Sequence, residues 1–149
     1  ATLPRISPDG RWLLFTMGRF GVFHIWHTDA DLYLINLQDG DMRKVDELNS
    51  DNVESYHSWS SNGRWVIFSS RRTDGNFTRP YIAHFDGQGR FTKPFELPQR
   101  NPNYHHELLR SYNIPEFMTG PVTIRPQQFA AQVRRDSIKA TAAVPCSRK

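Results

Sequence analysis

Residues 7–15 read SPDGRWLLF and residues 60–68 read SSNGRWVIF, so nearly the same nine-residue phrase occurs twice, 53 residues apart. Ser-Pro-Asp-Gly is typical of a type I turn. The Asn and Gly of the second copy fill the same positions and tolerate positive φ. A short run of β-forming residues follows each turn, at 12–16 and at 65–69. Each of the two copies of the phrase therefore predicts a turn that leads into a strand.

The sequence on either side of each phrase completes a four-stranded unit. Each of the two units spans about 45–50 residues, which is the length and strand count of a propeller blade. An ordinary two-sheet β structure is the alternative, and the repeated phrase favours the propeller. The further strands are expected at 3–7, 30–40 and 41–48 in the first unit, and at 56–60, 79–89 and 90–98 in the second.

The loops between the second and third strands differ, at 17–30 and 70–78. Repeats diverge in their loops, and binding is usually placed there. We therefore expect an all-β fold of two blades, at 1–50 and 51–98. A C-terminal extension with short helices follows at 99–149, and its last residues are expected to be disordered.

The phrase that starts at Ser7, with the later Asp31-Leu-Tyr-Leu-Ile and Asp39-Gly40, resembles the TolB-type β-propeller repeat, which is WD40-like. The second unit departs from that pattern, with Ser61 for Pro and Asn62 for Asp. The resemblance covers residues 3–98. It implies a C-terminal two-blade piece of a larger, bacterial, exported propeller in the periplasm or cell envelope. Its implied partners are proteins, the remaining blades, or further copies of the chain.

The charge is concentrated in the tail. The formal net charge is +4, and the 25 residues from Arg125 onward hold six basic residues and one acid, so the body is close to neutral. A solvated basic tail is favoured over a nucleic-acid or membrane contact. We expect neither a nucleic-acid partner nor membrane insertion. A single cysteine, Cys146, excludes an internal disulfide.

The motifs of common enzymes are missing from the sequence. It has no G-x-S-x-G, Walker A, G-x-G-x-x-G or C-x-x-C pattern. We therefore expect no catalytic residue, no cofactor and no enzymatic activity. The alternative is a propeller enzyme that acts on carbohydrate or peptide, with its site in blades outside this chain. His105 and His106 are expected at the surface.

The first candidate binding residues are His24 and His27. With Asp29 and Asp31 they place four potential metal ligands within eight residues. On a strand the two histidines would face opposite sides, so a metal site would need a loop. A long loop anchored by Phe23, Ile25 and Trp26 is the favoured interpretation, and no metal is expected.

Three further candidates are Arg71, Arg72 and His57. An arginine pair can bind a carboxylate or phosphate, although pairing with Asp74 or solvation is favoured. Alternation along the expected innermost strand places His57 on one face with Trp59. His57 then either lines a central channel or, as we favour, forms a structural hydrogen bond to the neighbouring blade.

Overall fold

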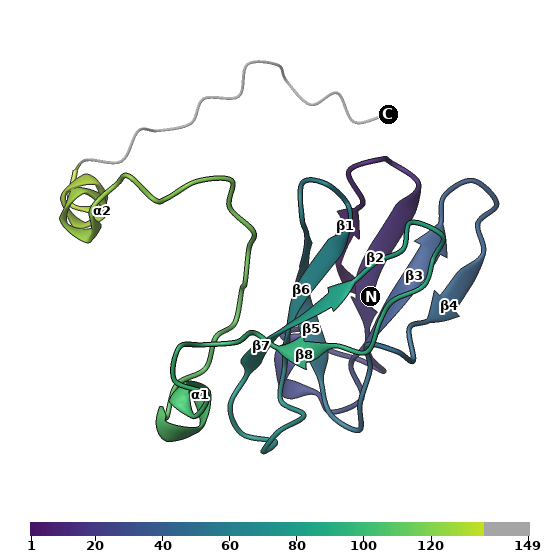
Figure 1. Ribbon diagram of the computed structural model, residues 1–149, viewed down its shortest axis with the longest axis horizontal. Helices are drawn as coiled ribbons and strands as arrows, with labels where there is room; N and C mark the ends of the chain where they lie inside the picture. The colour runs from purple at the N-terminus through teal and green to yellow at the C-terminus, as the bar shows by residue number, and fades with distance from the viewer. Residues whose placement is uncertain (136–149) are drawn as a thin grey trace, which may run out of the picture. The chain divides into compact units, whose positions relative to one another are not determined.

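The computed structural model describes residues 1–135 and contains two four-stranded antiparallel sheets, drawn side by side in Figure 1. This confirms the all-β fold class predicted from the repeated phrase. The first sheet has the order β1-β2-β3-β4 and the second has the order β5-β6-β7-β8. The strands of the first sheet are β1 (Thr2–Ile6), β2 (Trp12–Met17), β3 (Asp31–Asn36) and β4 (Met42–Lys44). Those of the second are β5 (Glu54–Trp59), β6 (Trp65–Ser70), β7 (Arg79–His84) and β8 (Phe95–Glu96).

The repeated phrase forms the same hydrogen-bonded turn in both sheets. The Ser7 hydroxyl donates to Asp9 Oδ1 (2.5 Å) and accepts from Trp12 N (3.0 Å), and Gly10 N donates to Ser7 O (2.9 Å). The second sheet repeats these contacts. The Ser60 hydroxyl donates to Asn62 Oδ1 (2.7 Å) and accepts from Trp65 N (2.9 Å), and Gly63 N donates to Ser60 O (2.9 Å). The phrase recurs because each sheet uses this turn.

Asn62 takes the place of Asp9 in the second turn and acts as the same hydrogen-bond acceptor. Its Oδ1 also accepts from Arg64 N (3.0 Å), as Asp9 Oδ1 accepts from Arg11 N (3.2 Å). Of the turn residues only the glycines have positive φ, 73° at Gly10 and 65° at Gly63. The expectation that Asn contributes through its tolerance of positive φ is therefore wrong.

The two sheets pack through a defined pair of faces. Leu14 and Leu34 are paired across β2 and β3, and they contribute to the core from the first sheet. Phe68 and Tyr81 are paired across β6 and β7, and they contribute from the second sheet. The core between the sheets also includes Leu32, Val45, Leu48, Val66, Ala83, Phe85 and Phe91. Burial of this apolar surface is the main stabilising term.

The outward face of the second sheet is covered by the following chain. Ser69 Oγ donates to the carbonyls of Tyr112 (2.7 Å) and Asn113 (2.8 Å), and Tyr112 N donates to Thr78 O (3.0 Å). Ser58 Oγ donates to Glu116 (2.6 Å). The segment 97–119 therefore packs over the second sheet.

Within the unit 1–119, no segment covers the outward face of the first sheet in this way. Leu13, Phe15 and Ile35 line an apolar depression of about 340 Å³ on this face, together with Ala1, Thr2 and Pro4. The Phe15 ring lies 5.8 Å from that of Tyr33 on the same face.

Two short helices follow the sheets. α1 (Tyr104–Glu107) belongs to the compact unit Ala1–Thr119, whereas α2 (Pro126–Val133) lies in a separate unit that begins at Gly120. His106 is half-exposed, but His105 is buried, so the expectation that both histidines lie at the surface is wrong for His105. The prediction of a disordered C-terminal end concerns residues outside the range 1–135.

Candidate functional site

The loops at one end of the two sheets bring together most of the chemically distinctive side chains. These loops are 18–30, which follows β2, 45–53, which joins the sheets, and 71–78, which follows β6. Four of the five candidate residues lie in them. The fifth, His57, lies on β5 between the sheets.

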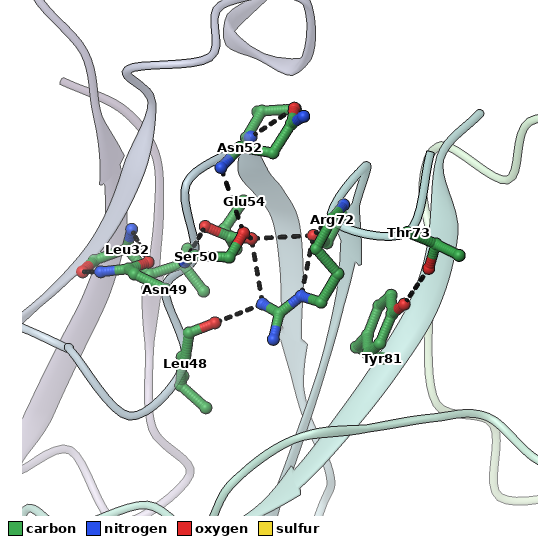
Figure 2. Close-up of polar contacts among 11 residues, drawn as sticks. Leu32, Leu48, Asn49, Ser50, Asn52, Glu54, Arg72, Thr73 and Tyr81 are labelled. Atoms are coloured by element: carbon green, nitrogen blue, oxygen red, sulfur yellow. Dashed lines mark hydrogen bonds and ion pairs between the residues drawn. The ribbon is translucent and has the colours of Figure 1, made fainter. Parts of the chain in front are cut away.

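A buried ion pair organises this end (Figure 2). The Glu54 carboxylate is fully buried and accepts a hydrogen bond from Arg72 Nη2 at 2.9 Å. It also accepts from the hydroxyls of Ser50 (2.7 Å) and Ser70 (2.8 Å). Arg72 donates in addition to the Leu48 carbonyl. Burial raises the pKa of Glu54, and the bonds from Ser50 and Arg72 partly offset that rise.

This network positions the connection between the sheets. Arg72 and Glu54 belong to the second sheet and its loop, whereas Ser50 and Leu48 lie in the connection. Asn49 extends the link to the first sheet, because its side chain bonds both the N–H (2.8 Å) and the carbonyl (3.0 Å) of Leu32. Arg72 is thus held by the protein itself. No local sequence pattern indicated Glu54 as its partner, since the two residues are 18 positions apart.

Arg71 has a different environment from its neighbour. Its guanidinium lies 4.0 Å from the centre of the Trp26 ring, a cation–π contact between the loops 71–78 and 18–30. The residue is 9% exposed, and its Nε is buried without a hydrogen-bond partner. Burial lowers the pKa of Arg71. The expected pairing with Asp74 is not formed, because the Asp74 carboxylate binds Arg79 at 2.7 Å.

The histidines of loop 18–30 hold that loop together. His24 and Ile25 are buried in the 3₁₀-helix η1 (His24–Trp26), and His24 Nδ1 lies 2.9 Å from Thr2 Oγ1. Burial lowers the pKa of His24. His27 Nε2 lies 3.2 Å from the Val22 carbonyl, and the rings of His24 and His27 are 5.8 Å apart. The segment that holds His24 and His27 is a loop and not a strand. A metal site that used both histidines would have required this.

The nearby acids are bound elsewhere. Asp29 accepts from Arg19 N (3.0 Å), and Asp31 pairs with Lys44 (2.7 Å). Within residues 1–135, no group of three or more His, Cys, Asp or Glu side chains has the arrangement of a metal site. Of the three residues expected to anchor the loop, only Ile25 does so, in a small buried cluster that includes Ala30 and Val53. The expectation is wrong for Phe23 and Trp26, whose side chains are exposed.

His57 is a structural histidine. It is 1% exposed, and its Nε2 lies 2.9 Å from the Leu14 carbonyl in the first sheet. Burial lowers its pKa to about 4, so the ring is neutral at pH 7. The favoured interpretation, a hydrogen bond to the neighbouring sheet, is confirmed. Trp59 also reaches the first sheet, where its Nε1 donates to Arg5 O (3.1 Å), as strand alternation predicts.

A second depression lies at the opposite ends of β2 and β6. It has a volume of about 460 Å³ and is polar, and it lies between the two repeated turns and the loop after β7. Asp9, Arg11, Arg64 and Asp86 contribute charges of both signs. Arg11 is already bound to Gly87 O (2.6 Å). The depression therefore has no net charge that would select a ligand.

Comparison with known proteins supplies little beyond this geometry. No protein-family model and no curated protein sequence matches the chain. A solved structure provisionally named TolB, from Agrobacterium tumefaciens, is similar at 22% identity with a TM-score of 0.43. The match covers 59% of this chain and 27% of that one. Among residues 1–135, no helix is long and apolar enough to cross a membrane.

Proposed function

We propose that this chain is a non-enzymatic binding or scaffolding module that acts through protein–protein contacts, as part of a TolB-like β-propeller. The observation that carries the proposal is the open apolar face of the first sheet. Exposed, contiguous apolar surface on a folded protein marks an interaction site more often than a chance feature.

The repeat indicates which kind of structure would cover the open face of the first sheet. Leu13 and Phe15 on β2 correspond, 53 residues on, to Val66 and Phe68 on β6. Val66 and Phe68 lie on the face of the second sheet that is buried against the first. The open face of the first sheet is therefore the equivalent of a face that is already used for sheet packing. Its fitting occupant is another four-stranded sheet.

The cell-envelope setting follows from the repeat resemblance, which implies an exported propeller in the periplasm. For the loops we likewise propose that their partners are proteins. The enzyme alternative has no specific support from the described side chains. His57, its best candidate, is buried between the sheets. Glu116, an acid that contacts β5 through Ser58, is bound to Arg5 (2.6 Å).

The proposal is tested by the solution mass of the 149-residue chain. A second copy can offer the same apolar face, so we expect the mass from light scattering to rise with protein concentration. Leu13→Glu places a charge on the open face and should abolish this rise. Leu109→Glu alters a residue that is 86% exposed on the covering segment and should leave it unchanged. Circular dichroism establishes that both variants fold.

A chain that stays monomeric at all concentrations, and unfolds cooperatively, would contradict the assembly role of this face. The same conclusion follows if Leu13→Glu and Leu109→Glu behave alike. Association that persists in both variants would place the contact on another surface.

A further inference from the structure

Loop 18–30 displays four large apolar side chains to solvent. Phe20 is 77% exposed, Val22 71%, Phe23 69% and Trp26 66%. None of these side chains belongs to the core between the sheets, and the loop is anchored instead by Ile25, in a separate small cluster with Ala30 and Val53. Single exposed apolar residues are common, but four within seven positions form a patch.

The exposure is not the result of a loosely held loop. Asp29 accepts from Arg19 N at 3.0 Å and closes the base of the loop, and His24 is buried against Thr2. The Phe20 ring lies edge-on to His27 at 5.6 Å. Gly18 packs so closely that an added Cβ would come within 2.9 Å of the His24 ring. The loop is thus an internally packed platform, and a preformed surface loses little entropy when it binds.

A cation without an acidic partner lies at the edge of this platform. Arg71 stacks on Trp26, and among residues 1–135 its guanidinium has neither an ion pair nor a hydrogen bond. The acids on either side are already bound, Asp74 to Arg79 and Glu54 to Arg72. A partly buried arginine in this state favours a carboxylate, with which it can form two parallel hydrogen bonds.

We propose that the loop platform, Phe20 to Trp26 together with Arg71, binds a segment of another protein that presents a carboxylate beside apolar side chains. The carboxylate pairs with Arg71, and the neighbouring apolar side chains cover Trp26 and the exposed phenylalanines. The inference goes beyond the scaffold proposal. It concerns a different surface, and it stands or falls independently of the open face of the first sheet.

The charges favour a protein segment over a lipid surface. Peripheral binding to anionic lipid depends on several basic residues near the membrane. Here the exposed cation of loop 18–30, Arg19, lies 3.8 Å from Asp29, which leaves Arg71 as the single cation without an ion pair beside the platform within the unit 1–119. One cation surrounded by apolar side chains matches one carboxylate.

The test uses three tetrapeptides and the indole N–H signal of Trp26 in two-dimensional ¹H–¹⁵N NMR, assigned with Trp26→Phe. The peptides are acetyl-Phe-Leu-Glu-Leu-amide, its Gln counterpart, and that Gln peptide with a free terminal carboxylate. We expect a saturable shift with a carboxylate peptide and binding at least about tenfold weaker with the neutral one. The better of the two acidic peptides identifies a side-chain or terminal carboxylate as the source.

Variants separate the charge from the apolar surface. Arg71→Gln should reduce binding of the acidic peptides to the level of the neutral one. Phe20→Ala, which removes exposed apolar surface but keeps the Trp26 signal, should weaken all three. Arg19→Gln, in the same loop, is the matched control and should bind like the original chain. Thermal unfolding of each variant establishes that the fold is retained.

Two results would overturn the proposal. One is equal binding, or no binding, by the acidic and neutral peptides while the chain is folded. The other is sedimentation of the chain with phosphatidylserine vesicles that is retained in Arg71→Gln but lost in Trp26→Ala, because the platform would then be a lipid contact that does not use this cation.

Discussion

Leu3 and Tyr56 have the same left-handed backbone conformation, with φ of 54° and 51°, and Tyr56 follows Leu3 by 53 residues. Each lies where the pairing register shifts, between Thr2 and Arg5 on β1 and between Ser55 and Ser58 on β5. The repeat therefore includes a β-bulge at an equivalent position in each sheet, made by residues that do not favour this conformation.

Relief of that strain should be measurable at Leu3, which is 36% exposed. We expect Leu3→Gly to be neutral or slightly stabilising, and β-branched Leu3→Ile to lower the free energy of unfolding by about 1 kcal/mol. Urea denaturation measures both. Ile6→Gly, on the same strand, is the control and should destabilise, since Gly weakens a regular strand. If Leu3→Gly costs as much as Ile6→Gly, the conformation at Leu3 is not strained.

The two turn serines should be equally important. Ser7→Ala and Ser60→Ala each remove a hydroxyl that both donates and accepts, so each should cost about 1–2 kcal/mol of unfolding free energy. Ser61→Ala, at an exposed position in the second turn, should have little effect. Equal stability of Ser60→Ala and Ser61→Ala in thermal or urea unfolding would show that the hydroxyl network contributes nothing.

His57 should make the fold sensitive to acid. Its pKa is about 4 when folded and 6.5 in the unfolded reference, so the unfolded chain binds more protons between these values. Its contribution to stability is complete above pH 6.5 and is lost as the pH falls toward 4, a change on the order of 3 kcal/mol. Urea unfolding at several pH values should show this slope, and His57→Gln should flatten it. A slope unchanged in His57→Gln would assign the acid sensitivity to other groups.

The Glu54–Arg72 pair should show strong coupling. Arg72→Met leaves the Glu54 carboxylate buried without its cation, and it should cost roughly 3–5 kcal/mol. The double variant with Glu54→Gln should be less destabilised than Arg72→Met alone, because no unpaired charge remains. Lys44→Met breaks a more exposed pair and should cost within about 1 kcal/mol. If the effects of Arg72→Met and Glu54→Gln on the free energy of unfolding in urea are additive, the two residues are not coupled.

The sequence by itself determined the turns, the approximate strands and the fact that the fold is a repeat. These follow from short-range patterns, since Ser7, Asp9 and Gly10 form their turn within a few residues of chain. The hydrogen bond from His57 to the neighbouring sheet was also foreseen, because strand alternation gave its direction. The segment 18–30 was correctly identified as a loop, but of its three expected anchors, Phe23, Ile25 and Trp26, only Ile25 is buried.

Only the tertiary structure decided which charges are paired. Arg72 meets Glu54, and Asp74 meets Arg79 instead of the neighbouring arginines. The paired residues lie 18 and 5 positions apart in the sequence. Which of them meet depends on how the chain packs, and no local pattern encodes it. The bulges had no sequence signal either, because Leu3 and Tyr56 occupy positions where glycine would have indicated positive φ. The stacking of Arg71 on Trp26 joins loops of different sheets, so it exists only once the two sheets have packed.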